Sequence, residues 1–275
     1  MWELYLNELR RGCRRIEVRF ISMMLLFICI LAFLVNCLEF YGTSFSFIRK
    51  ASQMTIMISC YSSYFLSLLT ILLPLLAGFL YSDNFILEKN NGTLSLLLTR
   101  TSLKRIMLSK VFAVMTLPFV ISFFSLSVNI LLTYFTFPSV AGDSDLSFPA
   151  YDIGLNQYSS LYAFDLLRLN SEWGYTYLYV LLISLFASVL ALFIFSLVNL
   201  VGKNSYLTII GVFMTLIISG LVLALAGAER WSWHIAFRPY AIGSAITPFL
   251  WLLGLGGIAS GLLIIYTRRV ELIES

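Results

Sequence analysis

Six long apolar runs dominate this sequence and constrain its fold more than any other feature. They lie at residues 20–40, 56–81, 109–137, 176–201, 205–228 and 244–267. Each is at least as long as the roughly 20 residues that a helix needs to cross the hydrocarbon core of a bilayer. Backbone polar groups in lipid must find partners within the protein, so these runs predict a bundle of six transmembrane α-helices. We therefore expect an all-α, polytopic membrane protein with one domain over residues 1–275.

The composition supports this prediction. The 275 residues are 60% hydrophobic and 12% charged, with a mean hydropathy of +0.91, which excludes an ordinary soluble domain. Pro74 and Pro118 fall within the second and third runs, so we expect a kink or a tilt in both helices. The cysteines lie in or beside apolar runs without metal-ligand spacing, which favours buried free thiols over a disulfide framework. They are Cys13, Cys29, Cys37 and Cys60.

Lysine and arginine are divided unequally between the two sides of the predicted bundle. Thirteen of the eighteen fall in the N-terminal arm, in residues 82–110, at Lys203 and in the C-terminal tail. The other five are Arg49, Lys50, Arg168, Arg230 and Arg238. Cytoplasmic loops retain an excess of cations, so we expect both termini and the 82–110 segment in the cytoplasm. The cations are concentrated on one side of the predicted bundle, as membrane topology requires. The net charge of +4 therefore does not indicate a nucleic-acid partner.

Residues 1–19 predict an amphipathic helix at the membrane surface. Apolar residues recur along one edge at intervals of three and four: Trp2, Leu6, Leu9, Cys13, Ile16 and Phe20. Five arginines occupy the other faces: Arg10, Arg11, Arg14, Arg15 and Arg19. Such a helix lies in the headgroup layer, and its arginines also suit a cationic anchor for the first span. The two interpretations are compatible.

Two segments are expected on the opposite side. Residues 138–175 mix aromatic residues with acidic ones, so they suit a cationic or amphipathic substrate, or a divalent metal at Asp143 and Asp145. Without ligand geometry we favour a solvated extracytoplasmic cap. Residues 229–248 predict a re-entrant or interfacial segment, because it carries Trp231, Trp233 and Tyr240 beside Arg230 and Arg238. We assign its His234, the only histidine, to amphipathic packing.

Apart from Glu39, near the outer end of the first span, no Asp, Glu, Lys, Arg or His falls in the middle of any predicted span. Ion-coupled carriers hold their driving ion with ionisable groups at mid-membrane. Asn129 and Asn199 are the nearest polar substitutes, and interhelical hydrogen bonding explains both. The sequence also lacks a phosphate-binding glycine-rich loop, a nucleophile elbow and a metal-ligand cluster. We infer that the chain is not an enzyme and that energy for any uphill transport comes from outside it.

Residues 82–108 carry the clearest motif outside the apolar runs. Residues 90–92, Asn-Asn-Gly, break any helix, and Thr93 can cap the next one. Leucines then recur at helical spacing, at Leu94, Leu97 and Leu98, which predicts a short amphipathic helix. Because this helix has nothing of its own to cover, we expect it to dock in a partner's groove.

The same segment resembles the cytoplasmic signature of type-2 ATP-binding-cassette (ABC) permeases. In that family a Glu, a Gly-Thr-Leu triplet and a leucine pair lead to a basic residue and to a Lys at the start of the third span. The matching residues here are Glu88, Gly92, Thr93, Leu94, Leu97, Leu98, Arg100, Arg105 and Lys110. The chain departs from the pattern at Thr101-Ser102, where family members commonly have Pro, and this relaxes the helix stop.

The wider layout is similar too, with an amphipathic N-terminal helix, six spans and short re-entrant helices before the sixth. The large 138–175 loop resembles the subgroup that includes the permease of the copper-site maturation system for nitrous oxide reductase. The resemblance implies a type-2 ABC exporter (type V) fold in a bacterial or archaeal cytoplasmic membrane. It implies a permease dimer, formed with a second copy or a paralogue, that makes the translocation path.

The resemblance also assigns the partners. Separate cytoplasmic ATPase subunits would bind ATP and Mg, so this chain would hold no cofactor. The 82–108 loop would be the coupling helix, with Leu94, Leu97 and Leu98 in a groove of the ATPase. Glu88 would face a cation there or in the N-terminal helix. Three cations would face acidic partner groups or lipid phosphates: Arg100, Lys104 and Arg105. An extracytoplasmic accessory protein is a further candidate partner.

Two other classes of protein fit the same six runs. An ATP-independent secondary carrier or lipid-moving bundle explains the spans, but leaves the patterned loop and the missing intramembrane charges unexplained. A membrane sensor or assembly subunit would use residues 138–175 as its receptor surface. ATP-independent transport driven by a proton gradient would favour the carrier, and binding without transport would favour the sensor.

Overall fold

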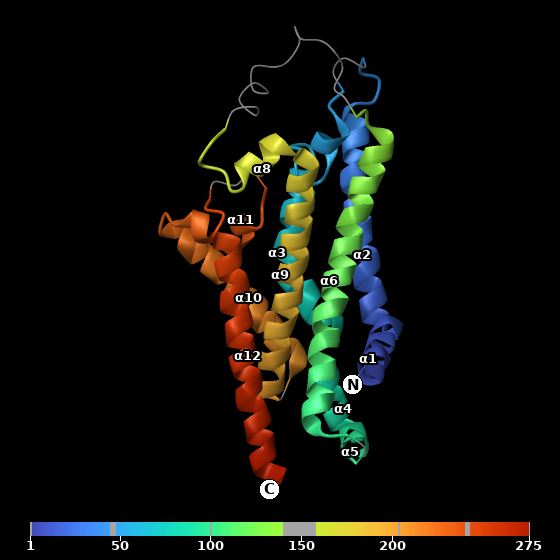
Figure 1. The fold of residues 1–275 in the computed structure, drawn as a ribbon, viewed down its shortest axis with the longest axis vertical. Coiled ribbons are helices and arrows are strands. Elements are labelled where there is room, and N and C mark those ends of the chain that lie inside the picture. Colours follow the sequence, from blue (N-terminus) through green and yellow to red (C-terminus); the bar gives the residue numbers. More distant parts are fainter. Residues whose placement is uncertain are drawn as a thin grey trace.

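The computed structural model describes residues 2–44, 48–99, 101–139, 158–202, 204–239 and 243–274, and within them the side chains of all but residues 90, 94, 95 and 269–274. Its elements are helices (Figure 1). They are α1 (Trp2–Arg14), α2 (Ile16–Glu39), η2 (Ala51–Met54), α3 (Ser63–Tyr81), α4 (Asn84–Asn90), α5 (Thr93–Leu98), α6 (Leu103–Thr136), α8 (Asp165–Asn170), α9 (Glu172–Val201), α10 (Ser205–Leu225), η3 (Glu229–Trp231), α11 (Trp233–Ala236) and α12 (Thr247–Glu274).

Six helical segments are long and apolar enough to cross a membrane. They are Ile16–Glu39, Ser63–Lys89, Leu103–Thr136, Glu172–Val201, Ser205–Leu225 and Thr247–Arg268. This confirms the prediction of an all-helical chain with six candidate spans. Pro74 and Pro118 lie inside α3 and α6, and both helices continue through them.

The second span starts later than its apolar run suggested. We expected a helix from residue 56, but α3 begins at Ser63, and residues 55–62 form a mostly buried irregular segment. Two asparagines satisfy the backbone in this region. Asn129 Oδ1 accepts a hydrogen bond from the Ile56 backbone N–H at 2.9 Å, and Asn36 Nδ2 donates to the Met54 carbonyl at 2.6 Å. Buried non-helical backbone is tolerated only with such partners.

The N-terminal helix is also divided where we expected one helix over residues 1–19. α1 ends at Arg14, Arg15 is extended at φ −66° and ψ 139°, and α2 starts at Ile16. α1 turns its Glu8 and Gly12 into the protein, whereas Trp2 on the predicted apolar edge is 69% exposed. A Cβ at position 12 would lie 2.4 Å from Leu117 Cδ1, so glycine allows α1 to approach α6 closely.

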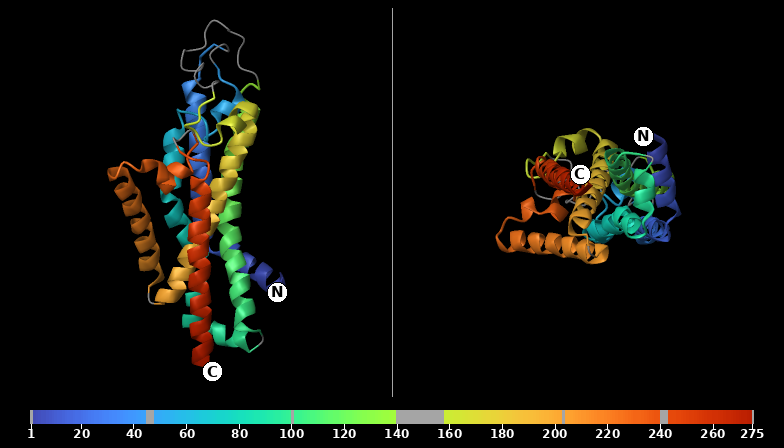
Figure 2. Two further views of the ribbon diagram at one scale, coloured as in Figure 1. Left: turned by 60° about the vertical axis from the view of Figure 1, so that its left-hand side comes forward. Right: turned by 90° about the horizontal axis from the view of Figure 1, so that it is seen from below.

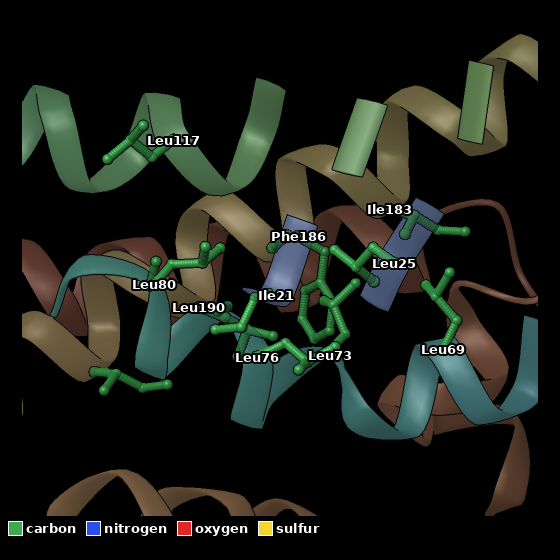
Figure 3. Close-up of a cluster of buried hydrophobic side chains, with 14 of the residues drawn as sticks. Ile21, Leu25, Leu69, Leu73, Leu76, Leu80, Leu117, Ile183, Phe186 and Leu190 are labelled. Atoms are coloured by element: carbon green, nitrogen blue, oxygen red, sulfur yellow. The ribbon is translucent and has the colours of Figure 1, made fainter. Parts of the chain in front are cut away.

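α9 is the central helix of the bundle. In its apolar span 72% of residues are buried, against 22% for α10 and 17% for α12. Figure 3 shows its Phe186 and Leu190 among apolar side chains of the neighbouring helices, including Leu25 of α2, Leu73 of α3 and Leu117 of α6. α10 stands at the margin of the bundle, as both views in Figure 2 show.

The two ends of the bundle carry different short elements. We call one the α5 end, because α4 and α5 lie there with α1 and the last turns of α12 (Figure 1). The other is the α8 end, where η2, α8 and α11 lie.

The four cysteines are free, as expected, but two of them are not buried. Cys29 is buried and Cys37 is half-buried, whereas Cys13 and Cys60 are exposed. Cys13 is exposed because α1 turns its Glu8 and Gly12, and not its apolar edge, towards the protein.

Candidate functional site

The segment at residues 82–108 folds into two short helices at the α5 end. α4 stops at Asn90, and Gly92 has φ +72°, a left-handed conformation that suits glycine best. α5 begins at Thr93, whose hydroxyl donates a hydrogen bond to the Glu88 carbonyl at 3.1 Å. The predicted helix break and the short helix after it are therefore both present.

A buried lysine lies beside this segment, about two turns into α6. Lys110 has no exposed surface, and its ammonium contacts two carboxylates. Its Nζ lies 3.1 Å from Glu8 Oε2 on α1 and 2.8 Å from Glu88 Oε2 on α4. Both carboxylates are buried as well. One cation therefore joins three helices that are far apart in the sequence.

Neutral donors and a second cation complete the contacts of these carboxylates. Tyr81 Oη donates to Glu8 Oε2 at 2.7 Å, and Asn84 Nδ2 donates to the same oxygen at 3.2 Å. Arg11 Nη1 lies 3.1 Å from Glu88 Oε1 and 3.7 Å from Glu8 Oε1. Glu88 thus meets a cation of the N-terminal helix, one of the two positions that the sequence left open for its partner.

Arg15 makes a second link between the same elements. Its Nη1 and Nη2 donate to Asp83 Oδ1 and Oδ2 at 2.7 and 3.1 Å, and its guanidinium lies 5.8 Å from the ring centre of Tyr81. Burial lowers the pKa of Arg15, but the hydrogen bond and the charge of Asp83 outweigh it, so this pKa lies above its ordinary value. The bidentate pair explains why the chain is extended at Arg15.

We call this cluster the polar junction. It comprises Glu8, Arg11, Arg15, Tyr81, Asp83, Asn84, Glu88 and Lys110. Its three carboxylates face three cations, so the formal charges cancel. Removing one partner of such a buried pair costs about 3–5 kcal/mol, because the other charge is left buried and unpaired. The junction therefore holds α1, α4 and α6 in one arrangement.

The remaining residues of the family-like motif lie outside the junction. Gly92 is in the exposed turn before α5, and Thr93 is the exposed first residue of α5. Arg105 is exposed on the first turn of α6. Leu97 and Leu98 are half-buried, and Leu98 packs against the apolar core of its own chain. The Leu94 side chain and Arg100 lie outside the described residues.

Leu96 was not among the leucines that the helical spacing predicted to dock in a partner. At 69% it is the most exposed apolar residue of α5 whose side chain is described. The spacing of Leu94, Leu97 and Leu98 predicted which face of α5 is apolar, but not that Leu98 would be covered by the chain itself.

The sequence also did not identify Glu8, Arg11 and Arg15 as partners of the loop. Their spacing of three and four residues was a usable signal, because it places an acid and two cations along one face of a helix. Glu88 and Lys110 belong to the family-like motif, but Asp83 carries no local signal, and these partners meet only when the helices pack.

At the α8 end, Asp165 and Glu172 are already paired. Asp165 Oδ1 accepts from Arg168 Nε at 2.6 Å, and its Oδ2 accepts from the Ser159 N–H at 2.8 Å. Glu172 Oε1 lies 2.8 Å from Lys50 Nζ. Among the described residues there is no cluster of three or more possible metal ligands. Asp143 and Asp145 lie outside them.

Residues 229–248 include two short helices, η3 and α11, before the last span. Trp233 is fully buried, and its Nε1 donates a hydrogen bond to the Leu216 carbonyl of α10 at 2.9 Å. Trp231 remains 43% exposed, and Tyr240 lies outside the described residues. His234 Nδ1 is 2.7 Å from Ser232 Oγ, and its pKa is lowered by burial and by Arg238.

Comparison with known proteins does not place the chain in a family. No protein-family model matches it, and no characterised protein sequence matches it.

Proposed function

We propose that this protein is the membrane-spanning permease subunit of an ABC exporter, and that α5 couples it to a separate cytoplasmic ATPase. The observation that carries the proposal is the contrast between α4 and α5. Glu88 of α4 is fixed by ion pairs to α1 and α6, while Leu96 of α5 is exposed beyond it. One end of the loop is thus anchored and the other is free to bind a partner.

The polar junction supplies a physical route for coupling. A push on α5 would pass to α4, and from Glu88 to Arg11 and Lys110. Ion pairs in a low-dielectric interior strongly resist separation, so α1 and α6 would move with α4 as one unit. Movement of α6 against α9 would then tilt the bundle between inward-open and outward-open states.

The position of the buried charges supports an ATP-driven permease over an ion-coupled carrier. The buried ion pairs of Lys110 lie near one end of α6 and are neutralised by fixed carboxylates. A driving ion needs an exchangeable site near mid-membrane. We therefore propose that ATP and Mg act on the partner, that the termini and the α5 end face the cytoplasm, and that a second copy or a paralogue completes the permease.

Co-purification tests this proposal. The tagged chain is purified from its native host in mild detergent, and the bound proteins are identified. We expect an ABC ATPase with the unmodified chain and its loss in the double variant Leu96→Asp, Leu97→Asp. Leu98 is left unchanged because it packs on the core of its own chain.

Leu166→Asp is the matched control. Leu166 lies on α8, which also has six residues, and it is 68% exposed against 69% for Leu96. The control variant should retain the ATPase. An unmodified chain that purifies without any ATPase, or a double variant that keeps its ATPase at full stoichiometry, would exclude docking through α5.

A further inference from the structure

A pocket of about 630 Å³ is lined in part by α8. α8 lies at the opposite end of the bundle from α4 and the polar junction (Figure 1). One wall comes from residues 158 and 160–166, before and within α8. The other comes from Arg230 and Trp231 of η3, residues 243–245 and Thr247, the first residue of α12. A backbone hydrogen bond from Gly243 N to the Leu161 carbonyl, at 3.1 Å, joins the two walls. The volume lies within the range of about 300–1,000 Å³ that is typical of small-ligand sites.

The charge available in this pocket is positive. Asp165 lines it, but Arg168 and the Ser159 N–H already satisfy that carboxylate. Burial raises the pKa of Asp165, but these hydrogen bonds outweigh it and leave the pKa below its ordinary value. Arg230 also lines the pocket, is exposed, and has no ion pair within the described part of the chain. An anionic group is therefore the charged ligand that this site favours.

The rest of the lining suits an amphiphile. Aromatic rings of Tyr158, Phe164 and Trp231 provide apolar walls, and Ser160 and Ser244 provide hydroxyls. Tryptophan and tyrosine are enriched where a protein meets lipid headgroups, because their rings have an apolar body and a polar edge.

An exposed apolar strip on α12 continues from the pocket. Phe249 packs edge to face on the pocket residue Phe164, with ring centres 6.3 Å apart. Leu250 and Leu253 follow on α12 and are 50% and 75% exposed. On a candidate membrane span, such a strip faces acyl chains. It leads from the pocket into the apolar part of the span.

We propose that this pocket binds the headgroup of an anionic phospholipid whose acyl chain lies along α12. Arg230 holds the phosphate, Trp231 and Tyr158 flank the glycerol region, and Leu250 and Leu253 contact the chain. The shape of the site, with a polar pocket open to an apolar strip, selects a whole lipid over a soluble anion. This site does not depend on ATPase coupling, so either proposal can fail without the other.

Native mass spectrometry of the delipidated full chain tests the proposal, with phosphatidylglycerol and phosphatidylcholine of equal chain length as probes. We expect tighter binding of phosphatidylglycerol, and a loss of about ten-fold or more in Arg230→Ala, because a charge-assisted hydrogen bond is removed. Phosphatidylcholine binding should change little. Arg238→Ala is the matched control, since Arg238 is exposed in the same segment but does not line the pocket.

Three results would overturn the proposal. The first is equal binding of the two lipids by the unmodified protein. The second is an equal loss in Arg230→Ala and Arg238→Ala, which would indicate a diffuse surface charge. The third is displacement of phosphatidylglycerol by an equal concentration of glycerol 3-phosphate, which would indicate a site for soluble anions. Leu253→Ser should weaken phosphatidylglycerol binding and leave the unfolding temperature unchanged, and unchanged lipid binding would exclude the α12 strip.

Discussion

At the scale of single residues, Lys110 is the clearest case of a charged side chain in a fully buried environment. A lysine with no exposed surface is tolerated only because two carboxylates and their hydrogen-bond donors surround it. Such an arrangement contributes little net stability compared with an apolar core, but it specifies one geometry. That geometry fixes the position of α4, and therefore where α5 begins.

Replacing Lys110 by Met should lower the free energy of unfolding by about 3–5 kcal/mol, because Glu8 and Glu88 would lose their buried cation and keep only Arg11, whose side chain is 57% exposed. Denaturant unfolding in detergent measures the change. Lys104→Met is the control, since Lys104 is exposed in the first turn of the same helix and its replacement should cost at most about 1 kcal/mol.

The interaction itself can be isolated by a double-mutant cycle. Adding Glu88→Gln to Lys110→Met removes one of the unpaired carboxylates, so the double variant should be more stable than the sum of the two single changes predicts. Additive losses would show that Lys110 and Glu88 are not coupled.

At the scale of elements, α1 is the helix whose position depends on one glycine. The Cβ atom of any other residue at position 12 would lie 2.4 Å from Leu117 Cδ1 of α6. The tip of Leu117 can move to admit a methyl group, but not a branched side chain. Gly12 therefore controls whether Glu8 reaches Lys110.

Gly12→Leu should lower the free energy of unfolding by at least about 1–3 kcal/mol, the usual cost of overpacking, and should also separate Glu8 from Lys110. Combining Gly12→Leu with Lys110→Met should then cost less than the sum of the two. Gly211→Leu on α10 is the control, because nothing lies within 4 Å of a Cβ there. Equal losses from the two glycine variants would show that α1 does not pack on α6.

Elements with a strong local signal were predicted well. Six spans, the break at Gly92 and a short helix after it follow from apolar run length, glycine and leucine spacing. Thr93 was expected to cap this helix, but its hydroxyl donates to the Glu88 carbonyl instead. Boundaries set by tertiary contacts were wrong. The start of α3 depends on Asn36 and Asn129, and the break at Arg15 depends on Asp83. Of the eight residues of the polar junction, the sequence singled out only Glu88 and Lys110 as site residues, since its members meet only after the helices pack.

At the scale of the whole molecule, burial is uneven across the bundle. In the apolar spans, 72% of residues are buried in α9, but only 22% in α10 and 17% in α12. α10 stands at the margin of the bundle (Figure 2). Lipid can cover the exposed faces of α10 and α12, and so can a second subunit. A permease that forms its path between two copies has such uncovered helices in the isolated chain.

We therefore expect two permease subunits in the purified complex. Where the complex is homomeric, native mass spectrometry should give two copies of the 31.2 kDa chain for every two ATPase subunits. A paralogue of similar size in place of the second copy would also satisfy this prediction. A complex with a single permease chain would contradict it.

The most direct measurement is site-specific photo-crosslinking in living cells from a crosslinking amino acid at position 96. If α5 docks in an ATPase at the cytoplasmic face, we expect one main protein adduct. Peptides from this adduct should identify the crosslinked partner as an ABC ATPase, which carries a phosphate-binding loop. The same probe at position 166 on α8 should not form that adduct. Crosslinks from position 96 to lipid alone, or to a protein on the opposite side of the membrane, would contradict coupling through α5.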